Sequence, residues 1–203
     1  MRRTLVPLAA AVAAFALTGS AIAEVSHDPA SVRAGGYVVE PNHTRVLFAV
    51  NHMGFTTYYG DFTGVSGKLD LNPSAPGASS VSVSIPTASV STTNATLDGE
   101  LKGADWLDAG KFPAITFKST SVTPTGPSTA KITGDLTLHG VTRPVTLDAS
   151  FHGAGVNMLD HKYTVGFDAV AHINRSDYGV KTYVPLIGDQ VDVIISAAFE
   201  KAD

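Results

Sequence analysis

The residues best suited to chemistry lie in two short segments, and the first of them falls within 134–151. In the stretch GDLTLHGVTRPVTLDASF, His139 and Arg143 stand where one alternating run of side chains ends and another begins. Gly140 and Pro144 at such a position are explained by the backbone conformation of a turn and do not indicate catalysis. Strand parity places His139 on the polar side of the first run. We therefore expect a structural turn with a solvated His139.

The second segment is INRSDYGV, in which Arg175 and Asp177 are close enough to pair. An ion pair or hydrogen bond that fixes the loop is the favoured interpretation, and a clamp on the polar group of a ligand is the alternative. His52 is a further candidate because it continues the parity of Val46 and Val50. It would contact a headgroup, or it would be a partly buried histidine bonded to backbone, and both interpretations stay open.

Catalytic and metal-binding patterns are missing from the sequence. The chain has seven histidines and no cysteine, and no two histidines lie within four residues of one another. Neither the H-E-x-x-H pattern of a zinc site nor a thiolate site exists. GVSGKL around Ser66 departs from the G-x-S-x-G elbow, and GAGVNM at 153–158 lacks the third glycine of a dinucleotide fingerprint. We expect no enzyme activity, no metal and no cofactor.

The elements that must position these residues are strands. Apolar and polar side chains alternate with period two, most clearly in SSVSVSIP, where Pro86 ends the ladder. Similar alternation marks seven other segments, near 44–50, 58–71, 114–121, 130–138, 144–151, 162–171 and 190–200. Only 94–112 breaks the rhythm, with Asn94 as a helix cap and leucines four residues apart, which predicts one or two short helical turns.

About eight short strands joined by Gly, Pro, Ser and Asn predict an all-β fold, either an antiparallel sandwich or a barrel. Composition alone does not choose between them. An eight-stranded barrel has an interior that side chains can fill or that can hold one slender ligand. The inward positions mix bulky aliphatic side chains with Gly134, Ala149, Ala169 and Ala197, which indicates spare room.

The chain begins with Arg2 and Arg3, an apolar run and Ala21-Ile22-Ala23, which is typical of a secretory signal peptide. We expect 1–23 to be cleaved, 24–36 to be a flexible lead-in and 37–203 to be one domain in the periplasm or outside the cell. Without the two arginines, the 14 basic residues fall to 12, and against 18 acidic residues the net charge becomes −6. That balance argues against nucleic acid and anionic membrane surfaces as partners.

Four motifs, FAVNHMGFTTYYGDF, LKGADWLDAGKFPAITFKS, GDLTLHGVTRPVTLD and INRSDYGV, resemble those of the YceI-like family of exported proteins that bind polyisoprenoid lipids. The resemblance covers 37–199 and implies an eight-stranded antiparallel lipocalin-like barrel. It also implies an apolar bore for an isoprenoid quinone, a polyprenyl chain or a similar amphiphile, without catalysis. The family commonly has a fuller charged helix with a His-Leu pair where this chain has Lys102-Gly103, so no helix contacts are transferred.

Parity and resemblance together predict non-catalytic binding, storage or transport of an isoprenoid lipid, with transient membrane contact. Whether two chains form a homodimer is left open, and the alternative function is a structural or protein-interaction barrel with a filled core. The predicted ligand-binding residues, with His52 and Arg175 at the polar end, are Val46, Phe48, Val50, His52, Phe62, Phe117, Leu136, Leu138, Val145, Leu147, Val165, Phe167, Arg175, Val193 and Ile195.

Overall fold

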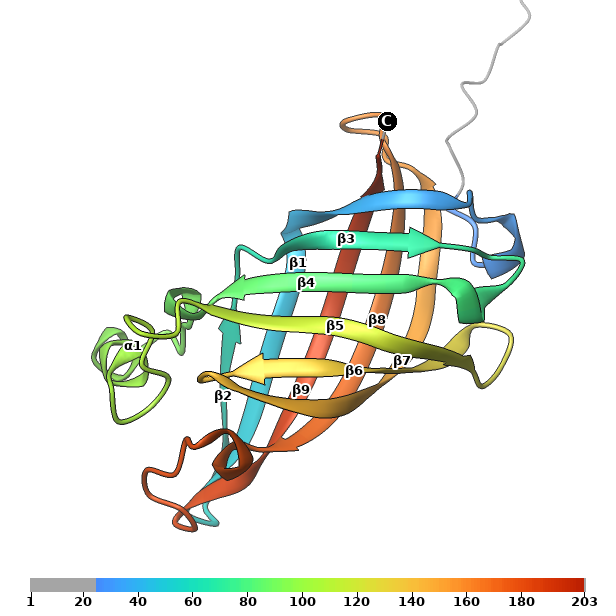
Figure 1. Cartoon of the computed structure of the whole chain (residues 1–203). Coiled ribbons are helices and arrows are strands. Elements are labelled where there is room, and N and C mark those ends of the chain that lie inside the picture. Colours follow the sequence, from blue (N-terminus) through green and yellow to red (C-terminus); the bar gives the residue numbers. More distant parts are fainter. Residues whose placement is uncertain (1–24, 203) are drawn as a thin grey trace, which may run out of the picture.

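A computed structural model of the chain describes residues 25–202 (Figure 1), so the predicted signal peptide at 1–23 lies outside the described residues. The elements in chain order are η1 (Pro29–Ser31), β1 (Gly35–His52), β2 (Thr56–Phe62), β3 (Ser66–Leu71), η2 (Pro76–Ala78), β4 (Ser80–Pro86), η3 (Thr87–Ser89), α1 (Ala95–Lys102), β5 (Ala114–Pro124), β6 (Thr129–Leu138), β7 (Val141–Val156), β8 (Tyr163–Asn174), η4 (Arg175–Tyr178) and β9 (Ile187–Lys201).

The strands form one closed antiparallel barrel. Consecutive strands from β3 to β9 pair with one another, and β1 closes the barrel by pairing with β9 on one side and with β3 on the other. β2 also pairs antiparallel with β1, with Val46 opposite Phe62, so β2 and β3 are two parts of one interrupted strand beside β1. Counted in this way the barrel has eight strands, which confirms the predicted all-β fold and selects the barrel over the sandwich.

The two ends of the barrel carry different structures (Figure 1). What we call the helix end carries α1, the β1–β2 turn, the β6–β7 turn and the β8–β9 loop. The opposite end, called the lead-in end, carries the loop at 157–162 and the segment before β1. Because the strands run between these two ends, the position of a residue along its strand decides which end its side chain is near.

The lead-in packs on the barrel at its own end. Ser26 forms two backbone hydrogen bonds with Ala154 of β7, at 2.8 and 2.9 Å. The Asp28 side chain caps η1, and Val32 is buried in the core. These contacts give the described part of the lead-in a defined place against β7, and its flexibility in solution stays a prediction.

The predicted helical segment contains α1, which begins as the sequence indicates. The Asn94 side chain accepts hydrogen bonds from the backbone N–H groups of Thr96 and Leu97, and Gly103 ends the helix. Asp98 in the first turn suits the positive end of the helix dipole. No helix in the described part of the chain has the length and apolar character required to cross a bilayer.

The packed core lies toward the two ends of the barrel rather than in its middle. Val165, Tyr37 and Phe199 are buried together near the lead-in end, and Val165 has no exposed surface at all. Tyr178 is buried at the helix end. The stability of the barrel therefore depends on these end clusters as well as on the hydrogen-bonded wall.

This arrangement predicts unequal costs for two chemically identical substitutions. Val165→Ala, in the packed cluster, should lower the free energy of unfolding by about 2 to 3 kcal/mol, because it removes apolar contacts and leaves a new void. Val193→Ala, in the middle of β9, should cost about 1 kcal/mol because its side chain already faces open space. Urea unfolding of lipid-free protein measures both, and equal costs would contradict a hollow middle.

Candidate ligand-binding cavity

A single long cavity of about 580 Å³ occupies the barrel interior. Every strand contributes to its lining, from Val39 on β1 to Phe199 on β9. Pro29 and Val32 reach it from the lead-in end, and Trp106 and Tyr183 reach it from the helix end. The volume falls in the range of roughly 300 to 1,000 Å³ that is usual for small-molecule sites. The inward side chains therefore do not fill the barrel, which weighs against the filled-core alternative.

Small residues in register make one wall of the cavity. Ala149 on β7 lies opposite Ala130 on β6 and opposite Ala169 on β8, and Ala169 in turn lies opposite Ile195 on β9. All four line the cavity. A row of methyl side chains across three neighbouring strands keeps the bore open at this level. The spare room predicted from the sequence thus comes in part from aligned alanines.

Two glycines hold aromatic rings against the wall. A Cβ atom on Gly134 would lie 2.5 Å from the ring of Phe117, and one on Gly60 would lie 2.3 Å from the ring of Phe48. Each ring therefore rests on a glycine of the neighbouring strand instead of projecting freely across the bore. Phe117 and Phe48 supply apolar surface to the lining while occupying little of its width.

Nearly all the predicted ligand-binding residues line this cavity, although their role in binding stays a prediction. The lining includes Val46, Phe48, Val50, His52, Phe62, Phe117, Leu136, Leu138, Val145, Leu147, Phe167, Arg175, Val193 and Ile195. Val165 is the exception. It points inward as its parity requires, but it is packed between the strands at the lead-in end and does not reach the cavity.

The lining carries an imidazole, a phenol and a carboxylate at the helix end, whereas the polar lining residues toward the lead-in end, among them Asn72 and Ser128, offer amide and hydroxyl groups. His52 at the end of β1 lies with its ring 6.0 Å from that of Tyr58, and both line the cavity. Glu100 of α1 and Trp106 join them. The sequence analysis did not predict Glu100 or Trp106 as lining residues. The available signal was the four-residue spacing of Leu97 and Leu101 in α1, both of which line the cavity. The ionisable side chains of this group, His52 and Glu100, therefore stand at the helix end of the bore.

Arg175 fixes the β8–β9 loop. It is 6% exposed, and four of its five N–H groups donate to backbone carbonyls of Gly188, Val180, Thr182 and Ile187 at 2.9 to 3.1 Å. Burial lowers the pKa of its guanidinium, and the charge of Asp189 opposes that change. Arg175 thus fixes the loop through these carbonyls and not through the expected pairing with Asp177, which leaves little donor capacity for a ligand.

Asp189 completes the anchoring of this loop. Its carboxylate accepts hydrogen bonds from the hydroxyl of Ser176 at 2.6 Å and from the backbone N–H of Ser176 at 2.9 Å. The hydroxyl hydrogen bond contributes most to lowering the pKa of Asp189, against the opposing effect of burial. The start and the end of the β8–β9 loop are therefore tied together beside the cavity.

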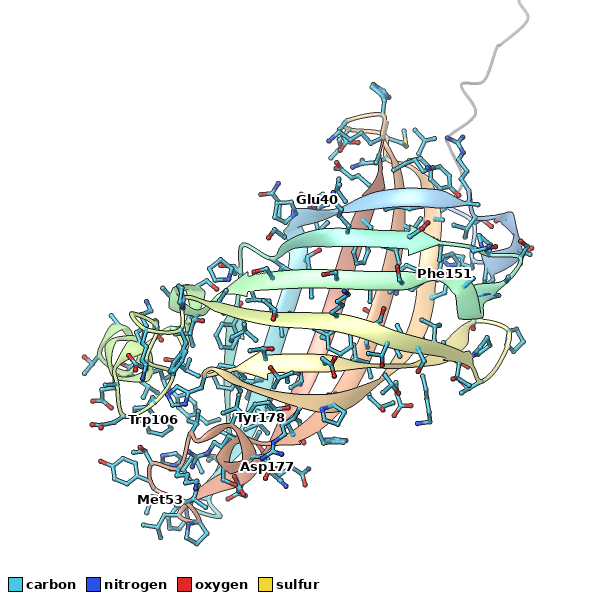
Figure 2. All side chains as sticks on the ribbon, in the orientation of Figure 1. Glu40, Met53, Trp106, Phe151, Asp177 and Tyr178 are labelled. Atoms are coloured by element: carbon cyan, nitrogen blue, oxygen red, sulfur yellow. The ribbon has the colours of Figure 1, made fainter. Side chains whose placement is uncertain are left out.

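Two loops meet at the cavity mouth on the helix end. The ring of Trp106 lies edge-on to Tyr183, with centroids 6.2 Å apart, and the guanidinium of Arg175 lies 5.3 Å from the centre of the Trp106 ring. The hydroxyl of Thr182 donates to the carbonyl of Asp105. Figure 2 shows Trp106, Tyr178 and Met53 at this same end, with Phe151 toward the other. Trp106 and Tyr183 therefore border the mouth from opposite loops.

His139 is structural, as predicted, but the expectation that it is solvated is wrong. Its Nδ1 lies 3.0 Å from the carbonyl oxygen of Tyr178, and its ring packs against Phe112 with centroids 4.7 Å apart. The reason is the turn itself. His139 has φ of 50°, a left-handed conformation that turns its side chain away from the direction that strand parity assigns.

The other histidines give no sign of a metal site. His172 pairs with Asp192 and His152 pairs with Asp168, and all four side chains are largely exposed on the outer surface of the barrel, as parity predicts. Within residues 25–202 no group of three or more metal-ligating side chains comes together. The chemistry that this site can offer is therefore apolar enclosure with a few polar groups toward the ends of the bore.

The anchoring role of Arg175 is testable. Arg175→Lys should lower the free energy of unfolding by about 2 kcal/mol, because one ammonium group cannot serve four carbonyls that the planar guanidinium reaches together. Amide hydrogen exchange at Val180 and Ile187 should accelerate with it, since both N–H groups bond within this loop. Arg143→Lys, at an exposed position near the start of β7, is the control, and equal effects of the two changes would contradict the assignment.

Comparisons with known proteins agree with this geometry. The sequence model described as the YceI-like domain matches residues 37–199. A protein of Pseudomonas fluorescens named UPF0312 protein is 39% identical over 178 residues, which are 84% of this chain and 89% of that protein. The crystal structure of Burkholderia cenocepacia BcnA superposes with a TM-score of 0.72 at 25% identity, covering 79% of this chain and 98% of that one.

A second solved structure shows the same fold at greater sequence distance. A polyisoprenoid binding domain from Saccharophagus degradans superposes with a TM-score of 0.61 at 14% identity, covering 84% of this chain and all of that domain. At this identity the likeness concerns the arrangement of strands alone. The barrel architecture thus persists at an overall identity of 14%.

Proposed function

This chain belongs to the YceI-like family, and we propose that it binds a long isoprenoid lipid, such as a quinone or a polyprenyl chain, inside its barrel without transforming it. The observation that carries the proposal is the long, mainly apolar cavity that crosses the barrel between its two ends. A protein named for binding polyisoprenoids shares the same arrangement of strands. The protein would act as a carrier or reservoir in the periplasm or outside the cell.

The lining suits a hydrocarbon tail whose polar head lies at the helix end. Leu147, Ala169 and Val193 surround the middle of the bore with hydrocarbon, where the tail would lie. His52, Tyr58 and Glu100 offer hydrogen-bonding groups at the helix end, where a quinone ring or alcohol would lie. Because the N–H groups of Arg175 donate to backbone carbonyls, its role in ligand binding would be to keep the loop at the cavity mouth in place.

Burial of hydrocarbon supplies affinity but little selectivity. Each methylene that leaves water contributes about 0.8 kcal/mol, so a chain of about twenty carbons gains roughly 16 kcal/mol relative to water. Most of this gain cancels when the lipid comes from a bilayer, where the chain is already in hydrocarbon. Selection among lipids would therefore depend on bore width and on the polar groups at the mouth.

The first test is identification of the cargo. Native mass spectrometry and solvent extraction of protein purified from the exported fraction should reveal a stoichiometric isoprenoid lipid. Removal of that lipid should lower the melting temperature, because a ligand that binds only the folded state stabilises it. Consistent recovery of empty protein, with no stabilisation on adding isoprenoids, would contradict the proposal.

A substitution in the alanine row tests the bore itself. Ala169→Phe places a ring in the cavity and should reduce isoprenoid loading at least tenfold or shift it toward shorter chains, as measured by mass spectrometry of the extracted lipid. The lipid-free variant should be as stable as the wild type or more stable, since the ring fills empty space.

Val170→Phe is the matched control, because the neighbouring Val170 side chain is exposed on the outer surface. It should leave loading unchanged. Undiminished loading of the same lipids by Ala169→Phe would show that the tail does not lie at this level of the bore.

A further inference from the structure

An exposed apolar surface surrounds the cavity mouth at the helix end. We call it the apolar tip, and it consists of Met53 and Phe55 of the β1–β2 turn with Tyr183, Pro185 and Leu186 of the β8–β9 loop. Phe55 is 83% exposed, Tyr183 65%, Leu186 62% and Met53 49%. So many large apolar side chains facing water in one place mark a site of interaction.

The tip is held in place by hydrogen bonds. Met53 and Gly54 both have positive φ, at 56° and 76°, and the backbone N–H of Phe55 donates to the carbonyl of His52 at 3.0 Å, which gives a tight hairpin turn. The Asn51 side chain accepts a hydrogen bond from Gly54 N–H at 2.8 Å. The backbone N–H of Met53 donates to the carbonyl of Leu186 at 3.0 Å, which joins the two loops. The apolar side chains therefore project from a fixed backbone.

The tip carries no charge. Residues 51–60 and 182–188 include no Asp, Glu, Lys or Arg, although the chain elsewhere has 14 basic and 18 acidic residues. Lys181, Asp61 and Asp189 mark the edges of these two stretches. Aromatic side chains with leucine and methionine, free of charge, suit insertion into the apolar boundary of a bilayer. Electrostatic attraction to anionic lipid would contribute little.

The tip is continuous with the cavity. Tyr183 belongs to both, and His52, Tyr58 and Ile187, from the same two segments, line the bore. A cargo that dissolves in bilayers would have to cross from hydrocarbon into the cavity through this mouth. We propose that the apolar tip docks onto the surface of an uncharged lipid bilayer, so that the cavity mouth faces the hydrocarbon from which the cargo comes. This inference rests on the proposed function, because it takes the cargo to be a membrane lipid.

The opposite end carries apolar side chains of a different kind. Leu159 is 91% exposed and Met158 59%, in the loop between β7 and β8. Asp160, His161 and Lys162 follow them directly, and neither apolar residue lines the cavity. This pair is therefore an internal comparison for the tip, because it exposes similar apolar surface with charged residues directly beside it in sequence and without the cavity mouth.

Sedimentation with sucrose-loaded phosphatidylcholine vesicles tests the proposal on the full mature protein. The wild type should bind these vesicles, with binding insensitive to salt and not increased by phosphatidylglycerol. Phe55→Ser combined with Leu186→Ser should weaken binding at least tenfold. Met158→Ser combined with Leu159→Ser should leave it unchanged.

Three results of this sedimentation assay would overturn the proposal. They are wild-type protein that does not bind neutral vesicles, equal binding by the tip variant, and binding that appears only with anionic lipid and disappears in salt. Light scattering of the same variants measures their oligomeric state, and so tests whether a second copy of the chain binds the tip. Conversion of a dimer to a monomer by the tip substitutions, with vesicle binding unchanged, would assign the tip to a dimer interface instead.

Loading from detergent solution separates this inference from the proposed function. When an isoprenoid alcohol is presented in detergent, the tip variant should fill its cavity as the wild type does, because no bilayer has to be approached. The same variant should load slowly from vesicles. Equal loading from both sources by the tip variant and the wild type would overturn membrane docking while leaving lipid binding intact, and no loading from either source by the wild type would remove the proposed function itself.

Discussion

Closure of the barrel through β1 is the constraint on which the rest of the structure depends. β1 pairs with β9 along one side and with β3 and β2 along the other, so the backbone hydrogen bonds of the wall are made between neighbouring strands. A closed wall of this kind does not need a filled centre to hold its strands together. Dense packing can therefore be confined to the ends, where Tyr37, Val165 and Tyr178 are buried, and the middle can stay hollow.

A hollow middle has an energetic cost that a cargo would offset. Apolar side chains that face empty space lose the contacts that a close-packed interior provides. The aligned alanines and the glycines beneath Phe48 and Phe117 keep this space open instead of closing it with larger side chains. A lipid that fills the bore would restore those contacts, so its binding and the stability of the barrel would be linked. The neutral tip at the mouth is consistent with this, since it presents apolar surface where a hydrophobic ligand would enter.

Period-two patterning predicted the strands and which of their residues face inward, because in a strand the direction of a side chain follows directly from its position. The choice of a barrel over a sandwich came from the family resemblance. Parity carries no information on depth along the axis, which is why Val165 faces inward yet lies in a packed end. It also fails where the backbone leaves the extended region, as at His139 with its positive φ. Glu100 and Trp106 could not be placed because a short helix and a long loop bring them to the mouth through contacts distant in sequence. The neutrality of the tip is visible in the sequence, but only the fold joins its two halves.

The position of Trp106 has a practical consequence. It is the single tryptophan of the chain, and it lies at the cavity mouth against Tyr183 and the guanidinium of Arg175. The indole emission of this protein consequently originates from one known place, where a change in local polarity would accompany the arrival of a guest. The molecule therefore contains its own spectroscopic reporter of occupancy, which needs no attached dye and leaves the bore unaltered.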